Sequence, residues 1–231
     1  MAVFAIGDLH LPGHEKKPMD VFGSHWDHHF ETISNNWNRL ITQKDIVLIP
    51  GDISWAMQLA QAVDDLNAIA ALPGRKLLLR GNHDYWWSSL SKVRAMLPQS
   101  MYVLQNDALM LEGRMFCGTR GWLLPSPQTP LPEADEKIYR RELLRLQMSL
   151  DKACALSTED VTVMLHYPPL LADGASTEFT QILESYPVKR VVYGHLHGAG
   201  IRIGFQGCRN GIEYLLVSCD ALQFCPRKVS D

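Results

Sequence analysis

The chain has no large excess of charge of either sign and no long hydrophobic run. Its formal net charge is -3 and its pI is near 6.3. Such a balance provides no global basic field, so a stable nucleic-acid partner is not expected, whereas a small anionic substrate remains open. The first apolar run, Val3–Ile6, has no basic leader and is too short to cross a membrane. It predicts a strand, and neither secretion nor membrane attachment is expected.

Cysteine is sparse, and no two cysteines form a CxxC pair. The five cysteines are an odd set, which favours reduced thiols in a cytoplasmic protein over a disulfide framework. We interpret them as core residues, with metal binding as the alternative. They are Cys117, Cys154, Cys208, Cys219 and Cys225.

Apolar, β-branched runs alternate with helical patterns, which is typical of repeated βαβ units. The first part predicts strands at Val3–Ile6, Ile46–Ile49 and Lys76–Leu79 and helices near Trp26–Ile41, Ala56–Ala71 and Trp87–Met96. The middle predicts short strands at Met101–Leu104, Ala108–Leu111 and Met115–Cys117, a proline-rich loop and a long helix near Ala134–Leu156. The last third predicts strands at Val161–Leu165, Lys189–Tyr193, Ile201–Phe205 and Ile212–Val217 and a helix near Phe179–Tyr186. We therefore expect an α/β fold, and with 231 residues and no evident linker or repeat, one domain spanning residues 1–231.

Polar residues with metal-binding side chains follow five of these apolar runs directly. The segments are Gly7-Asp8-Leu9-His10, Pro50-Gly51-Asp52, Arg80-Gly81-Asn82-His83-Asp84, His166, and Tyr193-Gly194-His195-Leu196-His197. Any one such Asp or His is more often a turn, cap or core residue. In open α/β sheets, however, functional groups gather outside the carboxyl ends of strands, so five such ends can converge on one crevice. Residues i and i+2 of an extended chain project to the same side, so Asp8 with His10, and His195 with His197, can act as pairs.

Taken in order, these segments match D-x-H, G-D, G-N-H-[D/E], H and G-H-x-H between residues 8 and 197. In this respect the chain resembles the calcineurin-like metallophosphoesterase superfamily, and a less characterised bacterial branch of it. The resemblance implies a four-layer α/β/β/α sandwich of two mixed sheets flanked by helices. It also implies a hydrolase that cleaves a small-molecule phosphomonoester or phosphodiester, with nucleotides among the candidate substrates, by means of a hydroxide shared by two divalent metal ions.

The resemblance also implies roles for particular residues. One metal would be held by Asp8, His10, Asp52 and His197, and the other by Asp52, Asn82, His166 and His195. His83 would protonate the leaving group or stabilise the transition state, and Asp84 is a candidate for orienting its imidazole. Two divalent ions about 3.5 Å apart repel by on the order of 20 kcal/mol at an effective dielectric of 20, so a bridging anion such as Asp52 is expected. This donor set suits Mn²⁺, Fe or Zn²⁺ and does not choose among them.

Several further residues carry two interpretations each. Arg120 could clamp a substrate phosphate or form a structural salt bridge, and His14 could contact substrate or be merely exposed. Tyr85–Trp87 could stack on a ring, although core packing is favoured. The remaining histidines of the next segment, His25, His28 and His29, are expected to be solvated.

Two features bear on the kind of activity. After the G-D motif the chain has Gly51–Ala56 without the Asp-Arg-Gly element of the superfamily's protein phosphatases, which disfavours a phosphoprotein substrate. There are two alternatives to an enzyme. The chain could be a scaffold that binds metal and phosphate without turnover, or a protein whose metal ions only stabilise the fold. The oligomeric state stays open.

Overall fold

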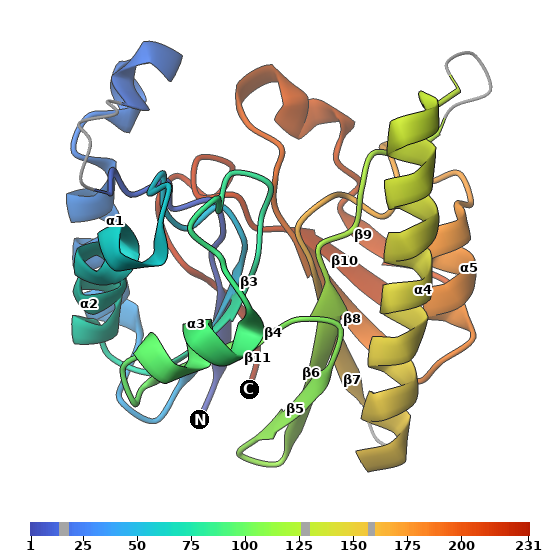
Figure 1. The fold of residues 1–231 in the computed structure, drawn as a ribbon, viewed down its shortest axis with the longest axis horizontal. Helices are drawn as coiled ribbons and strands as arrows, with labels where there is room; N and C mark the ends of the chain where they lie inside the picture. The colour runs from blue at the N-terminus through green and yellow to red at the C-terminus, as the bar shows by residue number, and fades with distance from the viewer. Residues whose placement is uncertain (14–18, 126–129, 157–159) are drawn as a thin grey trace.

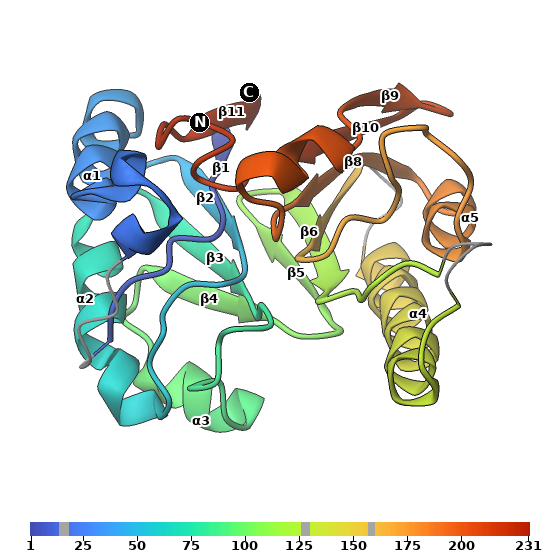
Figure 2. The same cartoon turned by 90° about the horizontal axis from the view of Figure 1, so that it is seen from above.

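The computed structural model describes residues 1–13, 19–125, 130–156 and 160–231. Two β-sheets lie face to face, and helices cover the outer face of each sheet (Figure 1). The four layers are also visible from above (Figure 2). The expected α/β/β/α sandwich is therefore confirmed. In the described parts of the chain, no helix is both long and apolar enough to cross a membrane.

The first sheet has the strand order β11-β1-β2-β3-β4, in which only β11 is antiparallel to its neighbour. Its strands are β1 (Val3–Ala5), β2 (Ile46–Pro50), β3 (Arg75–Leu79), β4 (Met101–Leu104) and β11 (Arg227–Ser230). Its outer face carries α1 (His29–Leu40), α2 (Val63–Ala71) and α3 (Leu90–Met96) (Figure 1). Short 3-10 helices lie at η1 (Met19–Phe22), η2 (Ser24–Trp26) and η3 (Leu59–Ala62).

The second sheet has the order β5-β6-β7-β8-β10-β9, with four parallel strands in the middle and an antiparallel strand at each edge. Its strands are β5 (Ala108–Leu111), β6 (Arg114–Thr119), β7 (Val161–Leu165), β8 (Val188–Tyr193), β9 (Gly207–Arg209) and β10 (Ile212–Leu216). Its outer face carries α4 (Glu133–Leu156) and α5 (Glu178–Glu184) (Figure 1). A further 3-10 helix, η4 (Gly198–Ile203), follows β8.

Alternation along the strands builds the core. In β2, Ile46 and Leu48 pack into the cluster between the sheets, whereas Val47 and Ile49 pack toward the helices. Because successive side chains of a strand point to opposite faces, a strand buried on both faces needs the continuous apolar run that the sequence shows.

Two predictions about the last third were wrong or incomplete. Ile201–Phe205 was expected to be a strand, but most of it belongs to η4, and the short edge strand β9 follows at Gly207–Arg209. The alternation of apolar and polar residues in this segment suggested a half-buried strand, but Ile203 is 52% exposed. Strand β11 was not predicted, because Val229 is its single buried residue and one apolar side chain leaves no period to detect.

Candidate metal centre

The candidate residues lie just beyond the carboxyl ends of β1, β2 and β3 in one sheet and of β7 and β8 in the other. Parallel strands place all these ends on the same edge of the sandwich (Figures 1 and 2). The expected convergence of distant segments is what the structure shows, and it produces two groups of donor atoms.

Asp8, His10 and His197 form the first donor group, in which one ligand atom of each lies within 4.8 Å of the others. The Nε2 atoms of His10 and His197 are 3.3 Å apart, and Nε2 of His197 is 3.5 Å from Oδ1 of Asp8. Asp8 and His10 are buried. Three donor atoms thus face one small volume.

Asp52, His166 and His195 form the second donor group by the same 4.8 Å criterion. Nε2 of His166 is 2.7 Å from Oδ1 of Asn82 and 3.5 Å from Oδ2 of Asp52. The amide oxygen of Asn82 therefore joins this group.

Asp52 connects the two groups. The Oδ2 atom that faces His166 at 3.5 Å is also 3.9 Å from Nε2 of His10. A carboxylate that reaches donors of both groups occupies the position that a ligand shared by two cations requires.

The backbone is unusual at the donor residues. Asp8, His10, Asp52 and His195 have φ of 58°, 45°, 50° and 72°, in the left-handed region. Non-glycine residues seldom adopt this conformation, and Asp and His are among those that tolerate it best. Such strain clusters at functional sites, where surrounding structure maintains it.

Two glycines allow the strands to approach closely. A Cβ atom at Gly81 would overlap Oδ1 of Asp52, and one at Gly194 would overlap Oδ2 of Asp8. Glycine lacks a Cβ atom, so it permits this close approach at both positions.

Burial and neighbouring charges shift the pKa values of the donor residues. Burial opposes ionisation of Asp8, but the hydrogen bond and charge of His197 hold its pKa well below the ordinary value. Burial, with the charges of Asp84 and Asp8, raises the pKa of Asp52 well above its usual range. Burial and nearby His166 lower the pKa of His195 to about 3, which keeps this imidazole neutral. Crowded acids and neutral imidazoles are what divalent cations need, so the donor set fits two such ions.

Partners outside the donor groups orient two of the imidazoles. Nδ1 of His166 donates to the carbonyl of Pro50 at 3.0 Å, and Nδ1 of His197 donates to Asp220 at 2.9 Å. Burial opposes protonation of His197, yet Asp220 and Asp8 raise its pKa to about 10. Both rings thereby present Nε2 to the donor groups, as metal-binding histidines do. Sequence reasoning missed Asp220 as a functional residue, because it belongs to none of the five motif segments.

His83 lies beside both groups. Its backbone amide donates to Oδ1 of Asp52 at 2.8 Å, and its ring packs 4.6 Å from Trp55 and 5.9 Å from His10. A cavity of about 140 Å³ is lined by His83, residues of both donor groups, and four apolar side chains. The four are Met19, Phe22, Trp26 and Trp55.

Asp84 joins the two loops beside the donor groups. Its buried carboxylate accepts hydrogen bonds from the amides of Ile53, Ser54 and Gly81 and from the indole of Trp86. These bonds join the loop after β2 to the loop after β3. We therefore interpret Asp84 as holding the two loops together; its expected role in orienting His83 stays a prediction.

Arg120 does not line the cavity beside His83. Its guanidinium stacks over the ring of Trp122 at 4.5 Å, and burial lowers its pKa. In the residues that the structure describes, no carboxylate forms an ion pair with Arg120, so the expected structural salt bridge is not found. His14 lies outside the described residues.

Other expectations are resolved more simply. Trp86 and Trp87 are buried, which confirms core packing, while Tyr85 is half exposed. His29 is not solvated as expected, because its two ring nitrogens lie 2.9 and 3.1 Å from the carbonyl oxygens of Leu9 and Trp26. Of the cysteines, Cys208 is exposed rather than in the core, and none belongs to either donor group.

A family model described as calcineurin-like phosphoesterase matches residues 1–199. The chain therefore belongs to the calcineurin-like phosphoesterase family. The family works with two metal ions, in agreement with the two donor groups.

Individual relatives are more distant. The Gene 66 protein of Mycobacterium phage D29 is 38% identical over 82 residues, which are 36% of this chain and 40% of that protein. The chain thus matches less than half of that relative's length. A solved protein of unknown function from Aquifex aeolicus has a TM-score of 0.50 at 14% identity, with 98% of this chain and 95% of that chain covered. The phosphopantetheinyl hydrolase of Mycobacterium tuberculosis has a TM-score of 0.53 at 14% identity, with 99% and 95% covered. These two structures share the fold.

Proposed function

We propose that the chain hydrolyses a small-molecule phosphate ester at two divalent cations held by the two donor groups. The first cation would be held by Asp8, His10, Asp52 and His197, and the second by Asp52, Asn82, His166 and His195. The observation that carries the proposal is the position of Asp52, whose Oδ2 faces both His10 and His166. The donor types suit Mn²⁺, Fe or Zn²⁺.

When bound, the cations would supply positive charge for the phosphate oxygens and lower the pKa of a water to near 7, a value typical of zinc. The protein residues set the charge of the centre. Asp8 and Asp52 contribute two negative charges against four from the cations, and the imidazoles add none because a cation binds the unprotonated ring. The centre therefore keeps a net positive charge that attracts a phosphate ester.

His83 is the residue that we assign to the leaving group. The bond from its amide to Asp52 fixes its backbone beside the donor groups, and its contact with Trp55 restricts the ring. From this position the imidazole can donate a proton to the departing oxygen, a contribution of about 10²–10⁴-fold in rate. The aromatic and apolar lining of the adjacent cavity favours an ester whose organic part carries a ring or another apolar face.

The test is hydrolysis of p-nitrophenyl phosphate and bis(p-nitrophenyl) phosphate by Mn²⁺-loaded protein. His83→Asn is expected to lower kcat by about 10²–10⁴-fold while the bound metal stays constant. His28→Asn is the matched control, because His28 is exposed, and Asn tolerates its left-handed backbone. If metal-loaded wild-type protein hydrolysed no phosphate ester in a broad panel, a scaffold without turnover would replace this proposal.

A metal titration that follows turnover and thermal stability together separates catalysis from a purely structural role. Structural metal sites are normally closed to substrate, whereas here an open cavity adjoins the donor residues. We expect turnover to rise with metal occupancy of both groups. Stability that rises without any turnover would indicate that the metals only support the fold.

A further inference from the structure

A separate cavity of about 280 Å³ lies where β3, β4 and β6 end against α4. It shares no lining residue with the cavity beside His83. We call it the arginine cavity, because four arginines line it together with the acid Glu142. The four are Arg80, Arg120, Arg141 and Arg145.

Glu142 does not balance this charge. Its carboxylate is fully buried, and Oε1 accepts from Arg145 while Oε2 accepts from Thr119, each at 2.6 Å. Arg141 is 3.9 Å from the same carboxylate, and its side chain is 52% exposed. One carboxylate therefore faces four guanidinium groups and is already engaged by one of them.

Arg80 and Arg120 are the arginines that lack an acidic partner. Across the described ranges, neither forms an ion pair with a carboxylate, and Nε of Arg80 is buried with no hydrogen-bond partner. A guanidinium group has five donors in a fixed fork, and a buried donor without a partner is costly. The arginine cavity thus offers positively charged N–H donors that no carboxylate of the described residues pairs with.

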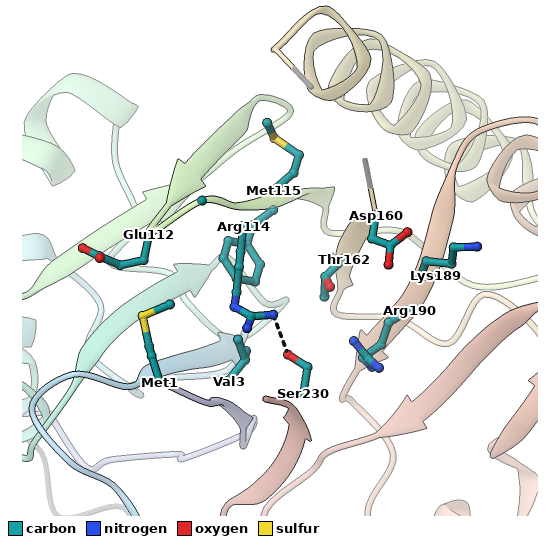
Figure 3. Close-up of a pocket in the computed structure, with 12 residues that line it drawn as sticks. Met1, Val3, Glu112, Arg114, Met115, Asp160, Thr162, Lys189, Arg190 and Ser230 are labelled. Carbon is teal, nitrogen blue, oxygen red and sulfur yellow. Dashed lines mark hydrogen bonds between the residues drawn. The ribbon is translucent and has the colours of Figure 1, made fainter. Parts of the chain in front are cut away.

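The arginine cavity is not the largest cavity among the described residues. A larger cavity of about 590 Å³ lies at the opposite edge of the sandwich, where Figure 3 shows its lining. Acids Glu112 and Asp160 line it together with basic side chains, and Arg114 donates to Ser230 at 3.3 Å (dashed in Figure 3). Arg190, also in its lining, donates to Glu213 at 2.9 Å. Its charges are of both signs, so it lacks the excess found in the arginine cavity.

The arginine cavity is linked to the metal centre through the backbone. Arg80 comes directly before Gly81 and Asn82, and the carbonyl of Arg120 accepts the amides of His166 and Tyr167 at 2.9 and 3.0 Å. A ligand held by Arg80 and Arg120 would therefore contact the two segments that position Asn82 and His166.

We propose that the arginine cavity binds a phosphate group. The oxygens of a phosphate match paired guanidinium donors, and its charge of up to about -2 offsets the excess of arginines better than a single carboxylate would. Two sources share this chemistry: free inorganic phosphate, or a further phosphate of the ester bound at the metal centre. The second source rests on the proposed function, whereas the first does not.

Equilibrium dialysis of the metal-loaded protein with radiolabelled inorganic phosphate tests the site. Wild-type protein is expected to hold a phosphate in addition to any at the metal centre. Arg141→Gln and the double variant Arg80→Gln/Arg141→Gln are expected to weaken this additional binding by about tenfold or more, as for a lost charge-assisted hydrogen bond. Arg145 is left intact, because its removal would leave the buried Glu142 without its ion pair.

Arg140→Gln is the matched control on the same helix, since Arg140 pairs with Glu136 and Glu178 and does not line the cavity. If the double variant fails to fold, Arg141→Gln alone decides, because its exposed side chain contributes little to stability. The proposal is overturned if wild-type protein holds no additional phosphate, if the cavity variants that fold bind it as tightly as wild-type protein, or if Arg140→Gln weakens binding as much as Arg141→Gln. Dialysis needs no turnover, so this outcome is independent of the proposed function.

Kinetics then distinguish the two sources. If the cavity takes a further phosphate of the substrate, Arg141→Gln raises KM for a nucleoside 3′,5′-bisphosphate by about tenfold and leaves KM for p-nitrophenyl phosphate unchanged. If free phosphate is the ligand, neither KM changes in phosphate-free buffer, while the variant loses the additional phosphate seen by dialysis. A rise in both KM values alike would contradict a separate site.

Discussion

Asp220→Asn tests how a residue outside the donor groups controls the metal centre. Oδ1 of Asp220 accepts from Nδ1 of His197 at 2.9 Å, and Oδ2 accepts from the amide of Gly198 at 3.0 Å. Asparagine has the same shape but only one acceptor oxygen. Its NH₂ group would therefore point at one of the two donors, and one hydrogen bond would be lost.

The size of the effect follows from that loss. A hydrogen bond to a charged group contributes about 1.5–3 kcal/mol. Substitution of a partner that orients a metal-binding histidine typically weakens metal binding by about 10–100-fold, which corresponds to a similar free energy. The Asp220 carboxylate stabilises positive charge on the His197 ring, and this charge can come from a proton or from a bound cation. Protons therefore compete with the metal for His197, so wild-type and variant proteins are compared at the same pH.

The assay is activation of turnover by Mn²⁺ in a chelator-buffered titration. The activation constant is expected to rise about 10–100-fold, with kcat at saturating metal changed only a few-fold. Asp151→Asn is the matched control, because Asp151 accepts from Tyr186 at 2.6 Å on the surface of α4. An unchanged activation constant with a lowered kcat would refute the reasoning, since Asp220 would then act on the reaction and not on the metal ligand.

The remaining predictions concern crowding, metal removal and pH. Gly81→Ala should abolish metal-dependent turnover while the circular dichroism spectrum is retained, because its Cβ would overlap Asp52; Gly200→Ala, whose Cβ would meet only Leu196 at 3.9 Å, should be active. Metal at about 100 times its Kd should stabilise the fold by about 2.7 kcal/mol, so chelation should lower Tm by roughly 5–10 °C in calorimetry; no shift would mean that the folded chain holds no metal. Burial lowers the pKa of Lys76 from 10.5 to about 8, so the unfolded chain binds more protons between these values and stability should rise with pH there, by up to about 3 kcal/mol. Lys76→Met should lose that rise in urea unfolding at pH 7 and 10, and an equal rise in both proteins would contradict the assignment.

The donor residues could be predicted from sequence because each one directly follows an apolar strand. Asp8 and His195 take their positions from the ends of β1 and β8, and parallel pairing within each sheet places such ends at a common edge. The only non-local information needed was that the two sheets face each other, which the family resemblance supplied.

Residues whose roles depend on contacts between elements could not be predicted in this way. Asp220 lies beyond β10 and meets His197 only once β8 and β10 have paired. The arginine cavity needs the ends of β3 and β6 to meet α4. Asp84 was adjacent to His83 in sequence, but its bonds lead away to the loop after β2.

The metal centre and the fold are energetically linked. Asp8 and Asp52 bury their carboxylates, and Asp8, His10, Asp52 and His195 also adopt left-handed backbone. Each such conformation costs of the order of 1–3 kcal/mol, a large sum for a protein stable by roughly 5–15 kcal/mol. The sheets must supply part of the compensation, because β2 holds Asp52 from a fully buried strand paired on both sides. Cations would supply the rest by neutralising the acids, so metal affinity and folding stability should change together in variants of these residues.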